Sequence, residues 1–256
     1  MLDQKIAIVT GAGSGLGEAT ALLFAKNGAT VVLADADVEA AERVLANIES
    51  EGGRGLVVKT DVSKVEDAKN LVDRTVQEFG RLDIAVNNAG IGGATAPTGE
   101  YPVDGWDTII GINLSGVFYG MRHQIPAMLA TGGGAIVNMS SVAGMAGLPN
   151  AAGYAAAKHG VIGLTKTAAL DHAEHGIRVN AVGPGFINTP LLGKRSVLDA
   201  GSSDTSAETQ ALAAMHPMNR LGEANEVAEL VLFLASERAS FITGSYYNVD
   251  GGYLAQ

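Results

Sequence analysis

Cysteine is absent from the 256 residues of this sequence. Disulfide bonds, thiolate nucleophiles and zinc–thiolate sites are therefore excluded. Basic residues are few, since 17 lysines and arginines stand against 27 aspartates and glutamates and the formal net charge is −10. A surface of that sign repels phosphate backbones and anionic lipids. We therefore expect neither nucleic acid nor a membrane as a partner. No metal site is expected either, because His159, His172 and His175 have poor spacing and setting for one.

Long apolar runs are absent as well, because no stretch approaches the roughly 18 apolar residues of a membrane-spanning helix. The N-terminal strand pattern has neither a basic start nor a cleavage site, so no signal peptide is expected and the expected location is the cytoplasm. Charged residues make up 17% and hydrophobic residues 47% of the chain. This balance argues against disorder and predicts a sizeable core.

Short β-branched runs alternate with longer helical patterns along the chain. The runs predict strands at residues 5–10, 30–34, 55–59, 83–87, 135–139, 177–182 and 245–249. The helical patterns cover residues 17–27, 38–50, 106–130, 154–174 and 225–236, and one more that Ser63 caps and Gly80 ends. This alternation predicts an α/β fold of the Rossmann type, with a doubly wound, seven-stranded parallel sheet, helices on both faces and a single domain over residues 1–256.

The stretch at residues 183–219 departs from the alternation, because it is long and rich in Gly, Ser and Pro. Loops of such length inside a compact domain usually serve a function. We therefore expect a substrate flap at about residues 186–219. Together with the segment after Ser141, it is expected to supply apolar pocket walls from Met145, Leu148, Leu191, Leu192 and Met218.

The sequence TGAGSGLG, residues 10–17, lies between the first expected strand and the first expected helix. Glycines at such a place let the backbone turn sharply and approach a pyrophosphate, which binds the free N–H groups at the helix start. A purely structural turn is the alternative interpretation. The residues expected to meet the cofactor here are Gly11, Ser14, Gly15, Leu16 and Gly17.

Asp35 ends the second expected strand. A carboxylate there can accept hydrogen bonds from the adenosine ribose hydroxyls, and its charge repels a 2′-phosphate. Ala36 follows it and Ser14 stands in the glycine loop, so nothing basic awaits a 2′-phosphate. The pattern favours NAD over NADP. The alternative is that Asp35 is a turn residue and that Asp37 or Asp61 does other work.

Tyr154 and Lys158 stand at the start of an expected helix, with the i, i+4 spacing that places two side chains on one face. A nearby ammonium stabilises a phenolate, so the pair could serve as a general base or acid. Ser141, just past the strand at 135–139, could hold a substrate oxygen while charge develops. Taken singly, the pair could be a solvated helix face and the serine a cap.

The order of these motifs resembles that of the short-chain dehydrogenase/reductase family, in its common NAD-dependent form. The resemblance covers nearly the whole chain. The matching motifs are the loop at residues 10–17, Asp61-Val62, Asn87-Asn88-Ala89-Gly90, Asn138-Met139-Ser140-Ser141, the pair Tyr154 and Lys158, Pro184-Gly185 followed by Ile187 and Thr189, and Asp250-Gly251-Gly252.

The resemblance implies a catalytic tetrad of Asn113, Ser141, Tyr154 and Lys158. Tyr154 would transfer the proton and Ser141 would orient the substrate oxygen. Lys158 would bind the nicotinamide ribose and lower the pKa of Tyr154. Asn113 would hold a water that passes the proton on from Lys158. The cofactor would carry the hydride, while the protein supplies position and electrostatics.

The resemblance also implies further contacts to NAD and an assembly. Asp61 and Val62 would meet the adenine ring. A homotetramer would form through the last two long helices and the C-terminal strand. The remaining cofactor-binding residues would be Asn88, Ala89, Gly90, Tyr154 and Lys158, with Pro184, Gly185, Ile187 and Thr189 around the nicotinamide carboxamide.

These motifs predict an NAD-dependent oxidoreductase that moves a hydride between nicotinamide and a secondary alcohol or ketone. Residues 216–218 and 239–244 are similar to stretches of NAD-linked dehydrogenases of cyclic alcohols and diols, so we expect a hydrophobic or cyclic small-molecule substrate. Two alternatives stay open. One is an NADPH-dependent ketoreductase, against which Asp35 argues. The other is a non-catalytic NAD-binding sensor, which would have no need of Ser141 and Tyr154 together.

Overall fold

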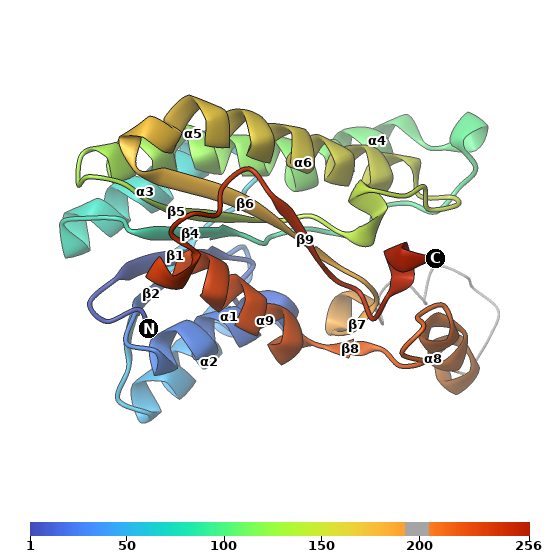
Figure 1. Cartoon of the computed structure of the whole chain (residues 1–256), viewed down its shortest axis with the longest axis horizontal. Helices are drawn as coiled ribbons and strands as arrows, with labels where there is room; N and C mark the ends of the chain where they lie inside the picture. The colour runs from blue at the N-terminus through green and yellow to red at the C-terminus, as the bar shows by residue number, and fades with distance from the viewer. Residues whose placement is uncertain (193–204) are drawn as a thin grey trace.

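The computed structural model describes residues 1–192 and 205–256. Within them, seven parallel strands form one sheet in the order β3–β2–β1–β4–β5–β6–β9 (Figure 1). The predicted seven-stranded, doubly wound parallel sheet is thereby confirmed. Its strands are β1 (Ile6–Thr10), β2 (Thr30–Asp35), β3 (Arg54–Lys59), β4 (Ile84–Asn87), β5 (Gly134–Met139), β6 (Ile177–Pro184) and β9 (Tyr246–Val249).

Helices cover both faces of the sheet (Figure 1). One face carries α1 (Gly15–Lys26), α2 (Val38–Ser50) and α9 (Ala224–Ala235), and the other carries α3 (Val65–Phe79), α5 (Gly116–Leu129) and α6 (Ala152–His172). Because both faces are covered, the central strands β1 and β4 are buried at every position. This explains why their sequences are continuous apolar runs rather than alternating ones.

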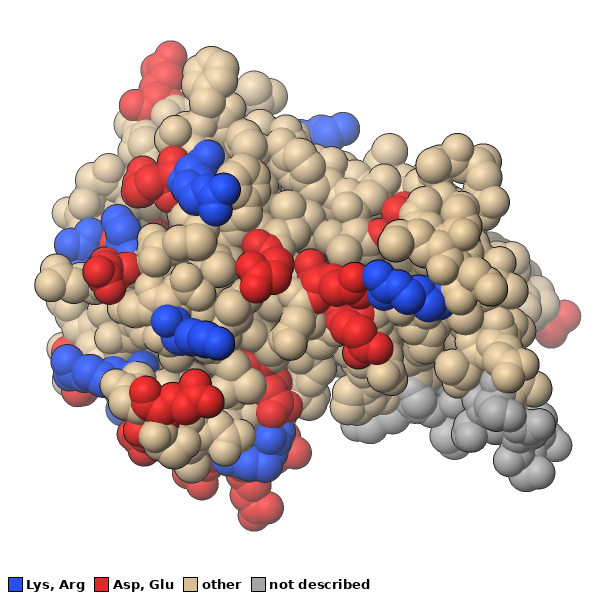
Figure 2. All heavy atoms as spheres, turned by 60° about the horizontal axis from the view of Figure 1, so that its bottom comes forward, with Lys and Arg blue, Asp and Glu red and all other residues tan. Residues whose placement is uncertain are grey.

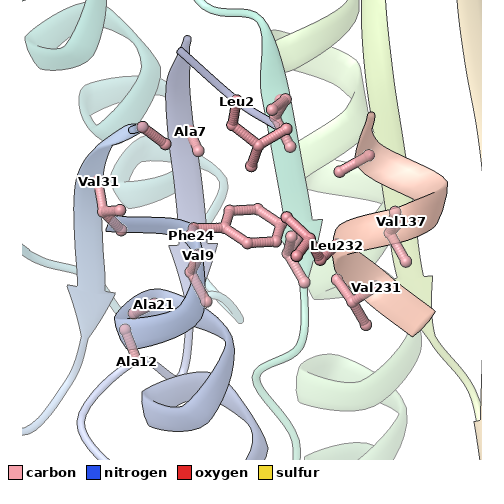
Figure 3. Close-up of a cluster of buried hydrophobic side chains, with 14 of the residues drawn as sticks. Leu2, Ala7, Val9, Ala12, Ala21, Phe24, Val31, Val137, Val231 and Leu232 are labelled. Atoms are coloured by element: carbon pink, nitrogen blue, oxygen red, sulfur yellow. The ribbon is translucent and has the colours of Figure 1, made fainter. Parts of the chain in front are cut away.

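Phe24 ties α1 to the sheet and to α9. Its side chain is fully buried, and its ring points toward Leu232 of α9 beside β1 (Figure 3). Truncating a buried phenylalanine to alanine costs about 3–5 kcal/mol, through lost burial and the cavity left behind. Packing of this kind fixes the axis of α1, and with it the glycine-rich loop from which α1 starts.

The helix predicted at 106–130 runs without a break from Val103 to Leu129 and contains a π-helical turn. Helix α4 spans Val103–Ile110, the wider turn spans Gly111–Ser115, and α5 begins at Gly116. The predicted long helix is therefore present, but nothing in the sequence indicated the π-turn inside it. At Gly116 the segment lies against Val62, where a Cβ would come within 3.0 Å of the Val62 carbonyl oxygen. π-Turns inside helices are frequent at functional sites, and this one contains Asn113.

The prediction that Ser63 caps α3 is wrong. Lys64, rather than Ser63, occupies the N-cap position, and it makes no side-chain cap hydrogen bond. The Ser63 hydroxyl donates to Oδ1 of Asp61 over 2.6 Å, and the Asp61 N–H donates to the Asp67 carboxylate over 2.9 Å. The Ser63 hydroxyl is therefore used in a local turn around Asp61 rather than as the cap of α3.

Part of the predicted flap forms regular structure beyond the carboxyl ends of the strands (Figure 1). Two short strands, β7 (Ile187–Asn188) and β8 (Gly222–Glu223), pair in parallel, and α8 covers Thr205–Ala214. The C-terminal 3-10 turn, Tyr253–Ala255, lies near α8, and Gln256 donates to the Met215 carbonyl over 3.3 Å. The middle of the predicted flap, residues 193–204, lies outside the described residues.

Opposite charges lie side by side on the surface. On the face drawn in Figure 2, lysine and arginine side chains stand next to acidic ones rather than in a basic patch. Among the described residues, Arg43 pairs with Glu18 and Arg220 pairs with Glu226, each at 2.7 Å. None of the helices within residues 1–192 and 205–256 is long and apolar enough to cross a bilayer.

Candidate active site

A cleft of about 350 Å³ opens at the carboxyl ends of the strands. The strand order reverses between β1 and β4, and ligands of doubly wound sheets bind at such a switch point. The cleft runs from the glycine loop and Asp35 at one end to the expected catalytic side chains at the other. Its predicted lining residues are Gly11, Ser14, Gly15, Leu16, Asp35, Asp61, Val62, Asn88, Ala89, Gly90, Ser141, Tyr154, Lys158, Pro184, Gly185, Ile187 and Thr189.

Glycines give the loop between β1 and α1 its shape. Gly11 and Gly15 have φ angles of +65° and +56°, a left-handed conformation that side chains disfavour. Gly17 has a different role, because it does not line the cleft. A Cβ on Gly17 would lie 2.0 Å from the Gly11 carbonyl oxygen, so its absence lets α1 pack against its own loop. The glycines therefore let the loop backbone approach the cleft, which Ser14 and Leu16 also line.

Hydrogen bonds from β4 hold the start of the loop. The Thr10 hydroxyl oxygen accepts from the backbone N–H groups of Asn88 at 2.9 Å and Ala89 at 3.0 Å. The Asn88 side-chain amide donates to the Thr10 carbonyl over 2.8 Å. Residues 88–90 thus connect two neighbouring strand ends, in addition to lining the cleft.

Asp35 is fixed at the rim of the cleft by two backbone donors. Its Oδ2 accepts from the Gly13 N–H at 2.8 Å, and its Oδ1 accepts from the Asp37 N–H at 3.0 Å. Each carboxylate oxygen can accept a further hydrogen bond. Arg43 also reaches the loop and donates to the Gly13 carbonyl over 2.9 Å, but its guanidinium is bound to both carboxylate oxygens of Glu18. The turn-residue alternative for Asp35 therefore describes only part of what the carboxylate can do.

Asp61 and Val62 line the same end of the cleft as Asp35. The hydrogen bond from the Ser63 hydroxyl, and to a lesser extent nearby Lys64, lowers the pKa of the Asp61 carboxyl group. A carboxylate at the cleft is a hydrogen-bond acceptor for amino or hydroxyl groups.

Ser141, Tyr154 and Lys158 converge at the other end of the cleft and are almost fully buried. The Lys158 nitrogen lies 5.6 Å from the centre of the Tyr154 ring and donates to the Met139 carbonyl over 2.8 Å. Burial lowers the pKa of Lys158 to about 8. The Ser141 hydroxyl oxygen accepts from the Ala143 N–H at 3.2 Å. The arrangement sets a phenol, an ammonium and a hydroxyl around one space.

Asn113 does not line the cleft, and its side chain is fully buried. Its Oδ1 accepts from the Ile91 N–H and its Nδ2 donates to the Ile91 carbonyl, both at 2.9 Å. These two bonds fix the orientation of the Asn113 amide beside Ile91. Gly90 lies between Asn113 and Lys158, since a Cβ on Gly90 would be 3.2 Å from Asn113 Oδ1 and 3.7 Å from Lys158 Nζ.

Comparison with known proteins decides the family. A family model described as "Enoyl-(Acyl carrier protein) reductase" matches residues 11–254. The chain is 47% identical over 254 residues to a cyclohexanol dehydrogenase of Acinetobacter sp. (strain SE19), covering 99% of this chain and 96% of the relative. The chain belongs to the short-chain dehydrogenase/reductase family.

Two solved structures support the assignment. The crystal structure of levodione reductase superposes with a TM-score of 0.96 and 37% identity, covering 100% of this chain and 99% of that one. An NAD⁺-bound xylitol dehydrogenase superposes with a TM-score of 0.93 and 38% identity, covering 98% and 99%. The predicted resemblance to the family and to cyclic-alcohol dehydrogenases is confirmed.

Membership in the short-chain dehydrogenase/reductase family gives the chemical class. The chain is an oxidoreductase that binds a nicotinamide cofactor and transfers a hydride between the cofactor and an alcohol or ketone. A non-catalytic sensor is therefore set aside. The residues present fit such a cofactor, because the glycine loop and the fixed Asp35 lie in one cleft with the expected catalytic side chains.

The sequence analysis missed an aromatic group that supports the segment around Pro184 and Ile187. The Phe186 N–H donates to Nε2 of buried His216 over 3.1 Å, while the His216 Nδ1 lies 2.9 Å from the Leu212 carbonyl of α8. The rings of Phe186, His216 and Tyr253 contact one another, with centres 5.6 to 6.0 Å apart. The position of Phe186, between two predicted cofactor residues, was the one signal that could have found it.

Proposed function

We propose that this chain is an NAD-dependent dehydrogenase of hydrophobic, cyclic secondary alcohols, with Ser141, Tyr154 and Lys158 as catalytic residues and Asn113 as their support. The observation that carries the proposal is the convergence of the three side chains in the cleft that also holds the glycine loop and Asp35.

Each side chain has a role that follows from its chemistry. A bound nicotinamide would supply the hydride-transfer chemistry of the reaction. Tyr154 accepts the proton of the alcohol in oxidation and returns it in ketone reduction. Lys158 favours the phenolate through its positive charge. Ser141 donates a hydrogen bond to the substrate oxygen on which charge develops.

Asp35 supports NAD rather than NADP as the cofactor. Its fixed carboxylate can accept bonds from two ribose hydroxyls, whereas a 2′-phosphate would meet an uncompensated negative charge. Arg43, the cation that reaches the loop, is neutralised by Glu18. The solved relative with bound NAD⁺ has the same overall fold.

An apolar wall supports a hydrophobic substrate. Leu148, Leu191 and Leu192 line the cleft as the sequence predicted, and Ile91, Val142 and Phe186 join them. Met145 and Met218 were expected there too, but they are exposed and do not line it. Burial of ring carbons against such a wall stabilises a cyclic alcohol by about 25 cal/mol per Å². The cyclohexanol dehydrogenase at 47% identity points the same way.

The test measures NADH absorbance with purified protein, NAD or NADP, and matched cyclic, linear and polyhydroxylated secondary alcohols. We expect turnover with NAD, and higher kcat/KM for cyclic than for linear alcohols of equal carbon number. Tyr154→Phe should abolish turnover and keep NADH binding. Turnover preserved in Tyr154→Phe would refute the catalytic assignment, and a preference for NADP would refute the role of Asp35.

The proposal also covers the oligomeric state of the protein, its substrate flap and its location in the cell. We expect a homotetramer, which light scattering coupled to gel filtration would show as about four times the chain mass of 26.1 kDa. We expect residues 186–219 to act as the substrate flap and the protein to work in the cytoplasm. Fractionation of cells that express the chain would test the last point.

A further inference from the structure

Three hydrogen bonds hold the end of β5, where the proposed catalytic serine stands. Lys158 Nζ donates to the Met139 carbonyl over 2.8 Å, and the Ser140 hydroxyl donates to the Lys158 carbonyl over 2.9 Å. The third bond comes from a strand on the far side of β6. The Tyr246 hydroxyl donates to the Ser141 carbonyl over 2.9 Å. The first two bonds connect β5 to Lys158 of α6, whereas the third connects it to β9, which contributes no residue to the proposed mechanism.

The sheet leaves a passage for the Tyr246 side chain. Strand β6 separates β9 from β5, so the ring has to cross β6 to reach Ser141. It crosses at Gly183, where a Cβ would lie 1.9 Å from the Tyr246 hydroxyl oxygen. Glycine at this position of β6 is therefore a condition for the contact with Ser141.

The next residue, Tyr247, has a different environment. Successive side chains of a strand point to opposite faces. Tyr247 packs against the hydrophobic cluster of α1 and α9, on the face away from α6. Two adjacent tyrosines thus offer a matched comparison, in which Tyr246 alone contacts the end of β5.

The contact determines the orientation of Ser141. A hydrogen bond to the Ser141 carbonyl fixes the peptide plane between Ser141 and Val142, and this plane sets the direction in which the serine Cβ leaves the chain. The hydroxyl oxygen is held separately by the Ala143 N–H at 3.2 Å. Small displacements of a group that positions a substrate cost rate far more than they cost stability.

Tyr246 is suited to remain a donor. Burial, followed by the negative charge of Asp250 and that of the Tyr154 phenolate, raises the pKa of Tyr246 well above its ordinary value. The hydroxyl therefore stays protonated at any pH at which the enzyme would work.

We propose that Tyr246 is a positioning residue, which holds the Ser141 main chain so that the serine hydroxyl meets the substrate oxygen. The inference rests on the proposed catalytic role of Ser141. Tyr246 would be a fifth residue beside the four of the expected tetrad, and it would contribute to the reaction without touching substrate or cofactor.

The test is a double-mutant cycle with Tyr246→Phe and Ser141→Ala, and Tyr247→Phe is the matched control. Steady-state rates with a cyclic secondary alcohol and NAD are normalised to NADH-binding sites, so that a partly folded preparation does not imitate a loss. We expect Tyr246→Phe to lower kcat about tenfold, with the KM for alcohol and the Kd for NADH changed by less than about twofold. Tyr247→Phe should keep kcat within about twofold of the wild type.

The cycle separates positioning from a general structural effect. If Tyr246 acts through the Ser141 hydroxyl, adding Tyr246→Phe to Ser141→Ala should lower kcat by less than about twofold. An unchanged kcat in Tyr246→Phe, or an undiminished loss in the Ser141→Ala background, would overturn the inference and leave the proposed function standing. A Ser141→Ala variant with wild-type kcat would instead overturn the catalytic role of Ser141, and this inference with it.

Discussion

The ammonium nitrogen of Lys158 lies 5.6 Å from the centre of the Tyr154 ring, in a wall of the cleft where both side chains are buried. Burial lowers the pKa of Lys158 to about 8, so its protonated form is less strongly favoured at neutral pH than that of an exposed lysine. A phenolate on Tyr154 would favour the ammonium in return, because opposite charges stabilise each other. We therefore expect an electrostatic coupling between the two groups.

This coupling predicts the pH dependence of alcohol oxidation. The base must be deprotonated, so kcat/KM should rise with pH through an apparent pKa below the value of about 10 for free tyrosine. Lys158→Met removes the cation that favours the phenolate, so the apparent pKa should move upward and the rate at neutral pH should fall about 100-fold or more. Rates from pH 6 to pH 11 measure both, and Lys166→Met on the exposed face of α6 is the control. An unmoved profile in Lys158→Met would contradict the assignment.

Cofactor preference should follow the charge at the end of β2. Asp35→Ser combined with Ala36→Arg replaces a carboxylate by a cation where a 2′-phosphate would lie. We predict that the ratio of kcat/KM for NADP to that for NAD rises by on the order of 100-fold, since charged hydrogen bonds contribute about 1.5–3 kcal/mol each. Asp37→Ser, which keeps a capping oxygen at the start of α2, should leave the ratio unchanged. An unchanged ratio in the double variant would mean that Asp35 is not the ribose ligand.

The parts of the site that could be predicted are those encoded locally. The glycine loop follows directly on β1, and Tyr154 and Lys158 are one helical turn apart, so their arrangement depends on few residues. The place of Asp35 at the cleft could be predicted for the same reason, because the end of a strand beside a glycine loop is a fixed place in this fold.

The parts that were missed depend on residues far apart in the sequence. Tyr246 and Ser141 are 105 positions apart, and the contact exists because Gly183 leaves space on a strand between them. His216 meets Phe186 across 30 positions. The side chain of Asn113 turns toward Ile91 because a π-turn changes the helix phase, and local propensity gives no measure of such a turn. These features require the packed structure.

The bonds between Asn113 and Ile91 predict a loss of stability on truncation. Asn113→Ala leaves the Ile91 N–H and carbonyl without their partners, and each unpaired buried group costs about 1–3 kcal/mol. We expect the free energy of unfolding to fall by about 2–4 kcal/mol, and the π-turn to lose its register with Ile91. Urea denaturation measures the change. Asn47→Ala, on the exposed face of α2, should change stability by less than about 0.5 kcal/mol. Equal stability of the two variants would show that the Asn113 amide does not hold Ile91.

Gly17 offers the sharpest test of the cofactor end, because its role is steric. A Cβ at this position would lie 2.0 Å from the Gly11 carbonyl oxygen and 2.7 Å from the Asn88 amide nitrogen. Gly17→Ala must therefore displace the loop or shift α1, which Phe24 holds against the core. Since the displaced backbone is the part that we expect to meet the pyrophosphate, we predict that NADH binding weakens by at least about tenfold, as fluorescence titration would show. Gly99→Ala places a Cβ with no atom within 4 Å and should bind NADH as the wild type does. Wild-type affinity in Gly17→Ala would mean that the loop tolerates a shift of its backbone, and that the pyrophosphate is bound elsewhere.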